Sequence, residues 1–161
     1  MNVRATLRRE DGAAAVEFAL IAGVLAMLIF GMLQFGVAFF QLQNLRAATR
    51  EGARAGAVGA TVGEIQAKTQ ANALGALPTP NGIEVRYTST GTFGGVPIPA
   101  AASRACPPKG LQTVNSAVQV KINLNNVSPA LKDVFIVDIP LIPPIHLENA
   151  AISGSFRCEG N

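Results

Sequence analysis

Apolar positions are concentrated near the N-terminus of the chain. Residues 18–45 carry no charged side chain, and the strongly polar residues among them are Gln34, Gln41, Gln43 and Asn44. A membrane-spanning helix needs about 20 predominantly apolar residues. A soluble core helix is rarely so long, and a secretory signal peptide has an apolar core of only about 7 to 15 residues. The pattern therefore predicts a membrane-spanning helix.

The predicted helix continues past this apolar run. Arg46, Arg50 and Arg54 recur at four-residue spacing, which places them on one side of the helix as a basic stripe. A solvated face is the favoured interpretation, and contact with anionic lipid headgroups or an acidic partner is the alternative. Several glycines follow, each costing about 1 kcal/mol inside a helix. The helix is therefore predicted to end or bend between residues 52 and 61.

The remainder of the chain shows a second helical pattern and several strand patterns. Thr61 and Glu64 have the spacing of a capping box, which predicts a helix over residues 62–74. Apolar and polar residues alternate as in strands with one buried face over residues 83–88, 114–124 and 150–158. The fold class predicted is α+β: a long N-terminal transmembrane helix, then a small domain with a second helix and a short antiparallel sheet of about three strands.

Two connecting segments have their own patterns. Residues 89–112 are rich in Gly, Pro, Ala and Ser, which predicts an exposed loop. Ser128 followed by Pro129 is typical of a helix start and predicts a short helix over residues 129–136. The apolar stretch over 134–147 holds three prolines and is too short to span a bilayer, so it should be core or an adhesive surface.

Composition and charge exclude several classes of function. The net charge is +3, the thirteen Lys and Arg residues are scattered, and Trp is absent, so the concentrated basic face of a nucleic-acid-binding protein is missing. His146 is the single histidine, and no phosphate-binding glycine loop, HExxH or GxSxG motif occurs. We predict no enzymatic activity, no cofactor and no metal site.

The two cysteines bear on the orientation of the span. Cys106 and Cys158 lack the short spacing of a metal or redox motif, so we predict a disulfide between them, with two buried thiols as the alternative. Arginines flank the span on both sides, so the positive-inside rule does not orient it. A disulfide persists only in an oxidising compartment, which would place the C-terminal part outside the cytoplasm.

The junction before the span carries the most specific pattern. Gly12 is followed by Ala13, an acidic residue comes at the fifth position after Gly12, namely Glu17, and the apolar helix begins directly beyond. This junction resembles the class III (type IV-like) prepilin signal. The longer stretch from Gly12 to Arg54 resembles the TadE-like pseudopilins of the tight adherence (Flp) pilus, and this resemblance covers about a third of the chain.

The resemblance implies a processing site and an assembly contact. A membrane prepilin peptidase, with its active site at the cytoplasmic face, would cut between Gly12 and Ala13. Glu17, with Phe18 beside it, would then pair with the free amine that Ala13 carries in a mature subunit. The alternative for Glu17 is a place at the headgroup level, where the positive end of the helix dipole favours an acid.

Small residues within the span suggest contact with a neighbouring helix. Gly23, Gly31 and Gly36 let another backbone come close, and Gln34 offers a hydrogen bond across such a contact. The alternative is that glycine is simply common in membrane helices.

The resemblance also implies a division of the chain and a function. The expected parts are a basic leader (1–12), a transmembrane helix with its extension (13–58) and an extracytoplasmic domain (59–161). The function implied is that of a pseudopilin or minor pilin that acts in assembly of a Tad/Flp pilus for adherence. It would lie in a bacterial inner membrane, with its N-terminus cytoplasmic.

This function implies partners. They are the prepilin peptidase, other pilins or pseudopilins, the inner-membrane assembly platform and membrane lipid, with no nucleic acid. The alternative is an uncleaved single-pass membrane protein whose outer domain binds a cell-envelope partner.

Overall fold

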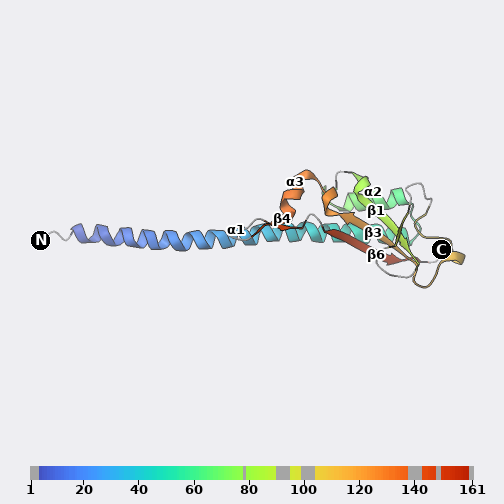
Figure 1. The fold of residues 1–161 in the computed structure, drawn as a ribbon, viewed down its shortest axis with the longest axis horizontal. Coiled ribbons are helices and arrows are strands. Elements are labelled where there is room, and N and C mark those ends of the chain that lie inside the picture. The colour runs from blue at the N-terminus through green and yellow to red at the C-terminus, as the bar shows by residue number, and fades with distance from the viewer. Residues whose placement is uncertain are drawn as a thin grey trace. The chain divides into compact units, whose positions relative to one another are not determined.

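The structure is a computed structural model, and it describes residues 4–77, 79–89, 95–98, 104–137, 143–147 and 150–159. The helices are α1 (Arg4–Ala57), α2 (Val62–Asn72) and α3 (Pro129–Lys132). The strands are β1 (Ile83–Thr88), β2 (Val96–Pro97), β3 (Ala117–Asn123), β4 (Ile136–Val137), β5 (Ile145–His146) and β6 (Ala151–Arg157). The chain forms two units, Met1–Val37 and Ala38–Asn161, and Figure 1 labels the elements of each.

The first unit is the N-terminal part of α1. The helix from Gly12 to Ala57 is long and apolar enough to cross a membrane, with a mean hydropathy of 2.4 in its most apolar stretch. None of that stretch is buried inside the protein. The predicted long apolar helix is therefore confirmed, and it fits a single-pass membrane protein.

The second unit is built around a four-stranded antiparallel sheet in the order β2-β1-β3-β6. The register pairs Val85 with Val120, and Val120 with Gly154. Because side chains alternate between the faces of a strand, the apolar residues of the three long strands share one face. They form a single core with residues of α2 and of the C-terminal part of α1, including Leu45, Ala48, Ala53, Val62 and Ile65. The predicted α+β class is confirmed.

Helix α2 begins where the sequence predicts. The side chain of Thr61 accepts a hydrogen bond from the Glu64 N–H, and the Thr61 N–H donates to Glu64 Oε2 at 2.8 Å. This reciprocal pair is the capping box. The helix ends at Asn72, two residues before the predicted end, and Leu74 and Gly75 then turn the chain with positive φ values of 50° and 79°.

Helix α1 ends at Ala57, within the predicted range of residues 52 to 61. The glycines that led to this prediction do not all act as helix breakers. Gly52 and Gly56 lie inside the helix, where they pack closely against α2 and β3. Tertiary packing here outweighs the low helix propensity of glycine. The chain leaves the helix at Gly59, whose φ of 98° favours glycine.

The segment predicted to be an exposed loop contributes to the fold. Its residues 96–97 form β2, which adds a fourth strand to the sheet by pairing with β1. Cys106 is buried, with 6% of its surface exposed. Strand β2 has only two residues, one of which is proline, so it shows no alternation of apolar and polar positions. The sequence pattern therefore did not predict this strand.

The apolar stretch near residues 134–147 lies partly in the core, as predicted. Phe135 is fully buried, and β4 and β5 pair as a two-stranded sheet with Ile136 opposite His146. The predicted short helix is present as α3 and the 3-10 turn Asp133–Phe135 that follows it.

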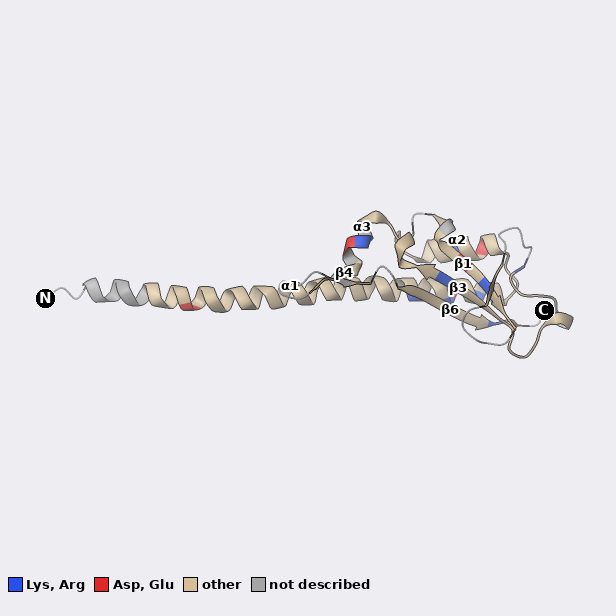
Figure 2. Ribbon diagram, viewed as in Figure 1, with Lys and Arg blue, Asp and Glu red and all other residues tan. Residues whose placement is uncertain are grey.

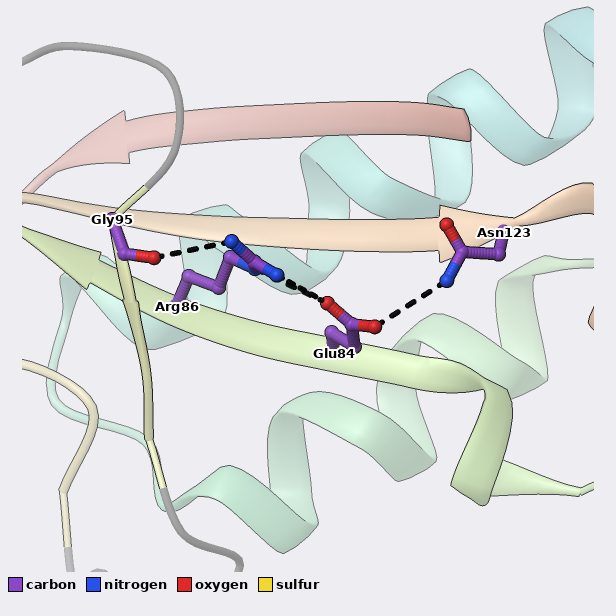
Figure 3. A network of polar contacts seen from close by, with 4 residues as sticks. All are labelled: Glu84, Arg86, Gly95 and Asn123. Atoms are coloured by element: carbon purple, nitrogen blue, oxygen red, sulfur yellow. Dashed lines mark hydrogen bonds and ion pairs between the residues drawn. The ribbon is translucent and has the colours of Figure 1, made fainter. Parts of the chain in front are cut away.

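Polar side chains tie the outer face of the sheet together, as Figure 3 shows. The guanidinium of Arg86 donates to Glu84 Oε2 at 2.8 and 3.1 Å and to the Gly95 carbonyl at 3.3 Å. Asn123 Nδ2 donates to the other oxygen of Glu84 at 3.3 Å. This network links β1 to β3 and to the segment that leads into β2.

Candidate functional site

The predicted processing site lies within α1. Gly12 and Ala13 are exposed, and a Cβ placed on Gly12 would meet nothing within 4 Å. The helix begins at Arg4, so Gly12 lies inside it and does not mark its start. One glycine costs an α-helix only about 1 kcal/mol, which a long helix tolerates.

Glu17 and Phe18 follow one turn later. Both are exposed, and 73% of the Phe18 surface is accessible. Residues four apart on a helix lie on the same face with Cβ atoms about 5 to 6 Å apart. Glu17 therefore lies one turn from Ala13 on the same face of the helix. Cleavage after Gly12 would create a free amine at Ala13, on that face. The described residues include no salt bridge to Glu17.

The small residues of the span do not all share one face. At 3.6 residues per turn, Gly23, Gln34 and Gly31 fall within an arc of about 80°. Gly36 lies about 140° further round from Gly31, on the side that also carries Phe18. A Cβ on any of the three glycines would meet nothing within 4 Å. The structure therefore brings Gly23, Gly31 and Gln34 together and separates Gly36 from them.

The disulfide joins Cys106 to Cys158, with the two Cα atoms 5.9 Å apart. The two segments that it joins also contact the end of α1. In the segment of Cys158, the Glu159 N–H donates a hydrogen bond to the Ala57 carbonyl at 3.1 Å. The Ala105 N–H also donates to the Ala60 carbonyl, at 3.2 Å. The predicted disulfide is therefore present and stabilises the second unit where α1 ends.

The described residues also bear on the predicted absence of a metal site. No group of three or more His, Cys, Asp or Glu side chains within them could hold a metal ion. His146 lies exposed in the short strand β5. The absence of enzymatic activity stays a prediction.

Two structural features have no counterpart in the sequence interpretation. One is the close packing at Gly52, Gly56 and Gly154, where an added Cβ would collide with neighbouring elements. The other is the position of β6 at an edge of the sheet. Glycine inside a strand pattern is a sign of close backbone approach, so Gly154 carried a usable signal. Nothing local indicates which strand forms an edge.

Comparison with known proteins finds one similarity, and it lies in the long N-terminal helix. A family model described as TadE-like protein matches residues 12–54. No curated protein and no solved structure matches the chain. The matched segment begins at Gly12, includes Glu17 and the three glycines of the span, and ends three residues before the last residue of α1. Over residues 12–54, the chain is thus similar to the TadE-like family.

Proposed function

We propose that this protein is a pseudopilin or minor pilin subunit that acts in assembly of a Tad/Flp pilus for adherence. The observation that carries the proposal is the start of the TadE-like match at Gly12, the residue after which a prepilin peptidase would cut. The apolar helix that follows anchors the mature subunit in the inner membrane. Its partners are the peptidase, other pilins or pseudopilins, the assembly platform and membrane lipid.

The disulfide supports one orientation of the span. A bond between Cys106 and Cys158 forms and persists in an oxidising compartment. The second unit then lies in the periplasm or outside the cell, and the N-terminus lies in the cytoplasm. This orientation brings Gly12 to the cytoplasmic face, where the peptidase acts.

Glu17 has a role in this proposal because an acid in the apolar zone of a membrane costs free energy until it is paired. Cleavage creates an amine at Ala13, and Glu17 lies exposed one turn away. The Glu17 carboxylate pairs with the Ala13 amine of a subunit, and this pair sets how the helix packs on its neighbours. Gly23 and Gly31 allow close approach on an adjoining part of the same surface.

The test is the N-terminus of the mature protein. Mass spectrometry should find a chain that starts at Ala13 in cells with the peptidase and at Met1 in cells without it. A Gly12→Leu variant should keep Met1 in both and should abolish piliation. An intact Met1 in cells that contain the peptidase would contradict the proposal.

A second candidate function is that of an uncleaved single-pass protein whose outer domain binds a cell-envelope partner. It is favoured by one observation: the family match ends at residue 54 and leaves the sheet and its disulfide outside. Under this alternative, Gly12→Leu changes neither the size of the protein nor its activity. The same variant therefore separates the two functions.

A further inference from the structure

The two edges of the four-stranded sheet are very different. Strand β2 has two residues, and the segment before it is held by the hydrogen bond from Arg86 to the Gly95 carbonyl. Strand β6 has seven residues and pairs with β3 along its whole length. In the described part of the chain, β6 has no strand on its other side. It is therefore a long open edge.

The pattern of hydrogen bonds between β6 and β3 shows which backbone N–H and C=O groups of β6 face the open edge. The Cys158 N–H donates to the Ser116 carbonyl at 2.9 Å, and the Leu124 N–H donates to the Ala150 carbonyl at 3.0 Å. Directly opposed residues in an antiparallel pair alternate between bonded and non-bonded. The even-numbered residues of β6 therefore bond to β3. The odd-numbered ones direct N–H and C=O outward, namely Ala151, Ser153, Ser155 and Arg157.

Strand β6 lacks most of the features that protect edges in other proteins. Very short strands, proline, bulges, charged side chains and cover by a helix or loop are the usual protection. Strand β6 carries one charged side chain, Arg157 at its end, and just past that end the Glu159 N–H is bonded to the Ala57 carbonyl of α1. The pairing of β6 with β3 is continuous, without a bulge, and the strand contains no proline. Ala151, Ser153 and Ser155 are exposed and small, and Phe156 keeps 41% of its surface accessible. An incoming strand would meet little steric hindrance.

Basic residues of α1 lie close to this edge. The backbone of α1 at Thr49 and Arg50 packs on Gly154, which brings Arg50 to the middle of β6. Helix α2 packs on another side of α1, where Lys68 pairs with Glu51 at 2.9 Å. Arg46 lies one turn before Arg50 and is also exposed. Figure 2 shows basic positions on the part of α1 that runs beside β6.

We infer that the open edge of β6 accepts an extended acidic segment of a partner protein, which adds to the sheet as a fifth strand. Backbone hydrogen bonds to the outward groups of β6 supply affinity, as in other cases of strand addition. Acidic side chains on the α1-facing side of the segment pair with Arg46 and Arg50, which supplies specificity. A second copy of this chain is a poor occupant, because it would bring the same arginines against each other.

This inference is independent of the proposed function. It concerns residues 38–159 and holds whether or not the leader is removed after Gly12. If the cleavage test fails, the inference about β6 still stands. If the peptide does not bind to β6, the result of the cleavage test is unaffected.

The experiment uses the full-length protein in nanodiscs of zwitterionic lipid. The probe is a short fluorescent peptide that alternates glutamate with threonine, and the matched control peptide carries lysine in place of glutamate. We expect saturable binding of the acidic peptide, and binding of the lysine peptide weaker by at least about tenfold, which corresponds to about 1.4 kcal/mol. Equal binding of the two peptides would overturn the inference.

Two variants separate the contribution of the backbone from that of the charges. Ser155→Pro removes an N–H that faces the open edge and not β3, so the fold should persist while binding is lost. Replacing both arginines, Arg46→Gln and Arg50→Gln, should weaken binding by about tenfold. Lys68→Gln changes the same charge on α2 and should leave binding unchanged. If the arginine variants alter only the association with anionic vesicles and the acidic peptide does not bind, the stripe serves lipid and the inference is wrong.

Hydrogen exchange of the wild-type protein gives a reading that does not depend on any variant. The amides of Ser153 and Ser155 should exchange quickly in the free protein and become protected when the acidic peptide is added. The amides of Ile152 and Gly154 are bonded to β3 and should be protected in both states. Unchanged exchange at Ser153 and Ser155 would show that the peptide does not add to β6.

Discussion

The glycines of α1 fall into two groups that differ in what surrounds them. A side chain at Gly23 or Gly31, in the first unit, would meet open space. A side chain at Gly52 would collide with Thr69 of α2, and one at Gly56 would lie 2.8 Å from atoms of both Ile65 and Val118. Glycine therefore has open space around it in the first unit, whereas in the second unit it is required for close packing.

The apolar side chains of α1 show the same division. Phe18 is 73% exposed, whereas Leu45 is completely buried in the core of the second unit. Large exposed apolar surfaces are rare on monomers in water and indicate a membrane or a partner. The first unit therefore presents an apolar surface suited to a membrane or a partner, whereas the second unit buries an apolar core of its own.

The largest test of this division is removal of the disulfide. Replacing Cys106 and Cys158 by alanine should lower the free energy of unfolding of the second unit by about 4 kcal/mol, because the bond closes a loop of about 50 residues in the chain-entropy model. The single tyrosine, Tyr87, lies in β1 and reports on that unit. Urea unfolding in detergent should shift to lower concentration by tyrosine fluorescence, while the helical signal of the first unit persists. An unchanged midpoint would contradict the prediction.

The second test replaces one glycine in each of the two environments by alanine. A Cβ on Gly154 would lie 2.7 Å from backbone atoms of Thr49 and Arg50. Gly154→Ala should therefore destabilise the second unit by about 1 to 3 kcal/mol, as overpacking does. Gly31→Ala is the matched control and should leave tyrosine-monitored unfolding unchanged. Equal effects of the two substitutions would show that the packing difference has no energetic meaning.

The sequence predicts those features that depend on neighbouring residues. The apolar helix follows from an unbroken run, and the start of α2 follows from Thr61 and Glu64, which contact each other directly. The strands near residues 83–88 and 150–158 follow from alternation of apolar and polar positions. The residues of the candidate processing site were named for the same reason, since Gly12, Ala13 and Glu17 form one local pattern.

Other features depend on residues far apart in the chain. Strand β2 exists because its two residues meet β1, and Cys106 is buried because its segment packs against the end of α1. Gly52 and Gly56 were interpreted as signs of a helix break, but what surrounds them comes from α2 and β3. Contacts of this kind leave no local pattern, so the open edge of β6 could not be predicted either.

A smaller effect is expected at the start of α2. Thr61→Ala removes the oxygen that accepts the Glu64 N–H and should cost about 1 kcal/mol of stability in the second unit. Thr61→Ser keeps that oxygen and should restore most of the loss. Thr79→Ala is the control, because Thr79 precedes a 3-10 turn without a side-chain capping bond. Equal losses at Thr61 and Thr79 would show that the capping box contributes nothing.

The smallest effect depends on pH. Hydrogen bonds from the backbone N–H and the hydroxyl of Thr61 hold the pKa of Glu64 below its ordinary value of 4.5. A carboxyl whose pKa is lower in the folded state stabilises the fold above its unfolded pKa, and this contribution is lost as the pH falls through the folded pKa. Glu64→Gln keeps an acceptor but removes the charge, so it should be less stable than the wild type near neutral pH.

The difference between the two proteins should then shrink as the pH is lowered through and below the unfolded pKa of Glu64. Urea unfolding followed by Tyr87 fluorescence at a series of pH values measures it. The contribution belongs to the second unit, which contains α2 and its capping box. A difference that stays constant with pH would mean that Glu64 acts through its shape and hydrogen bonds, and that its charge does not stabilise α2.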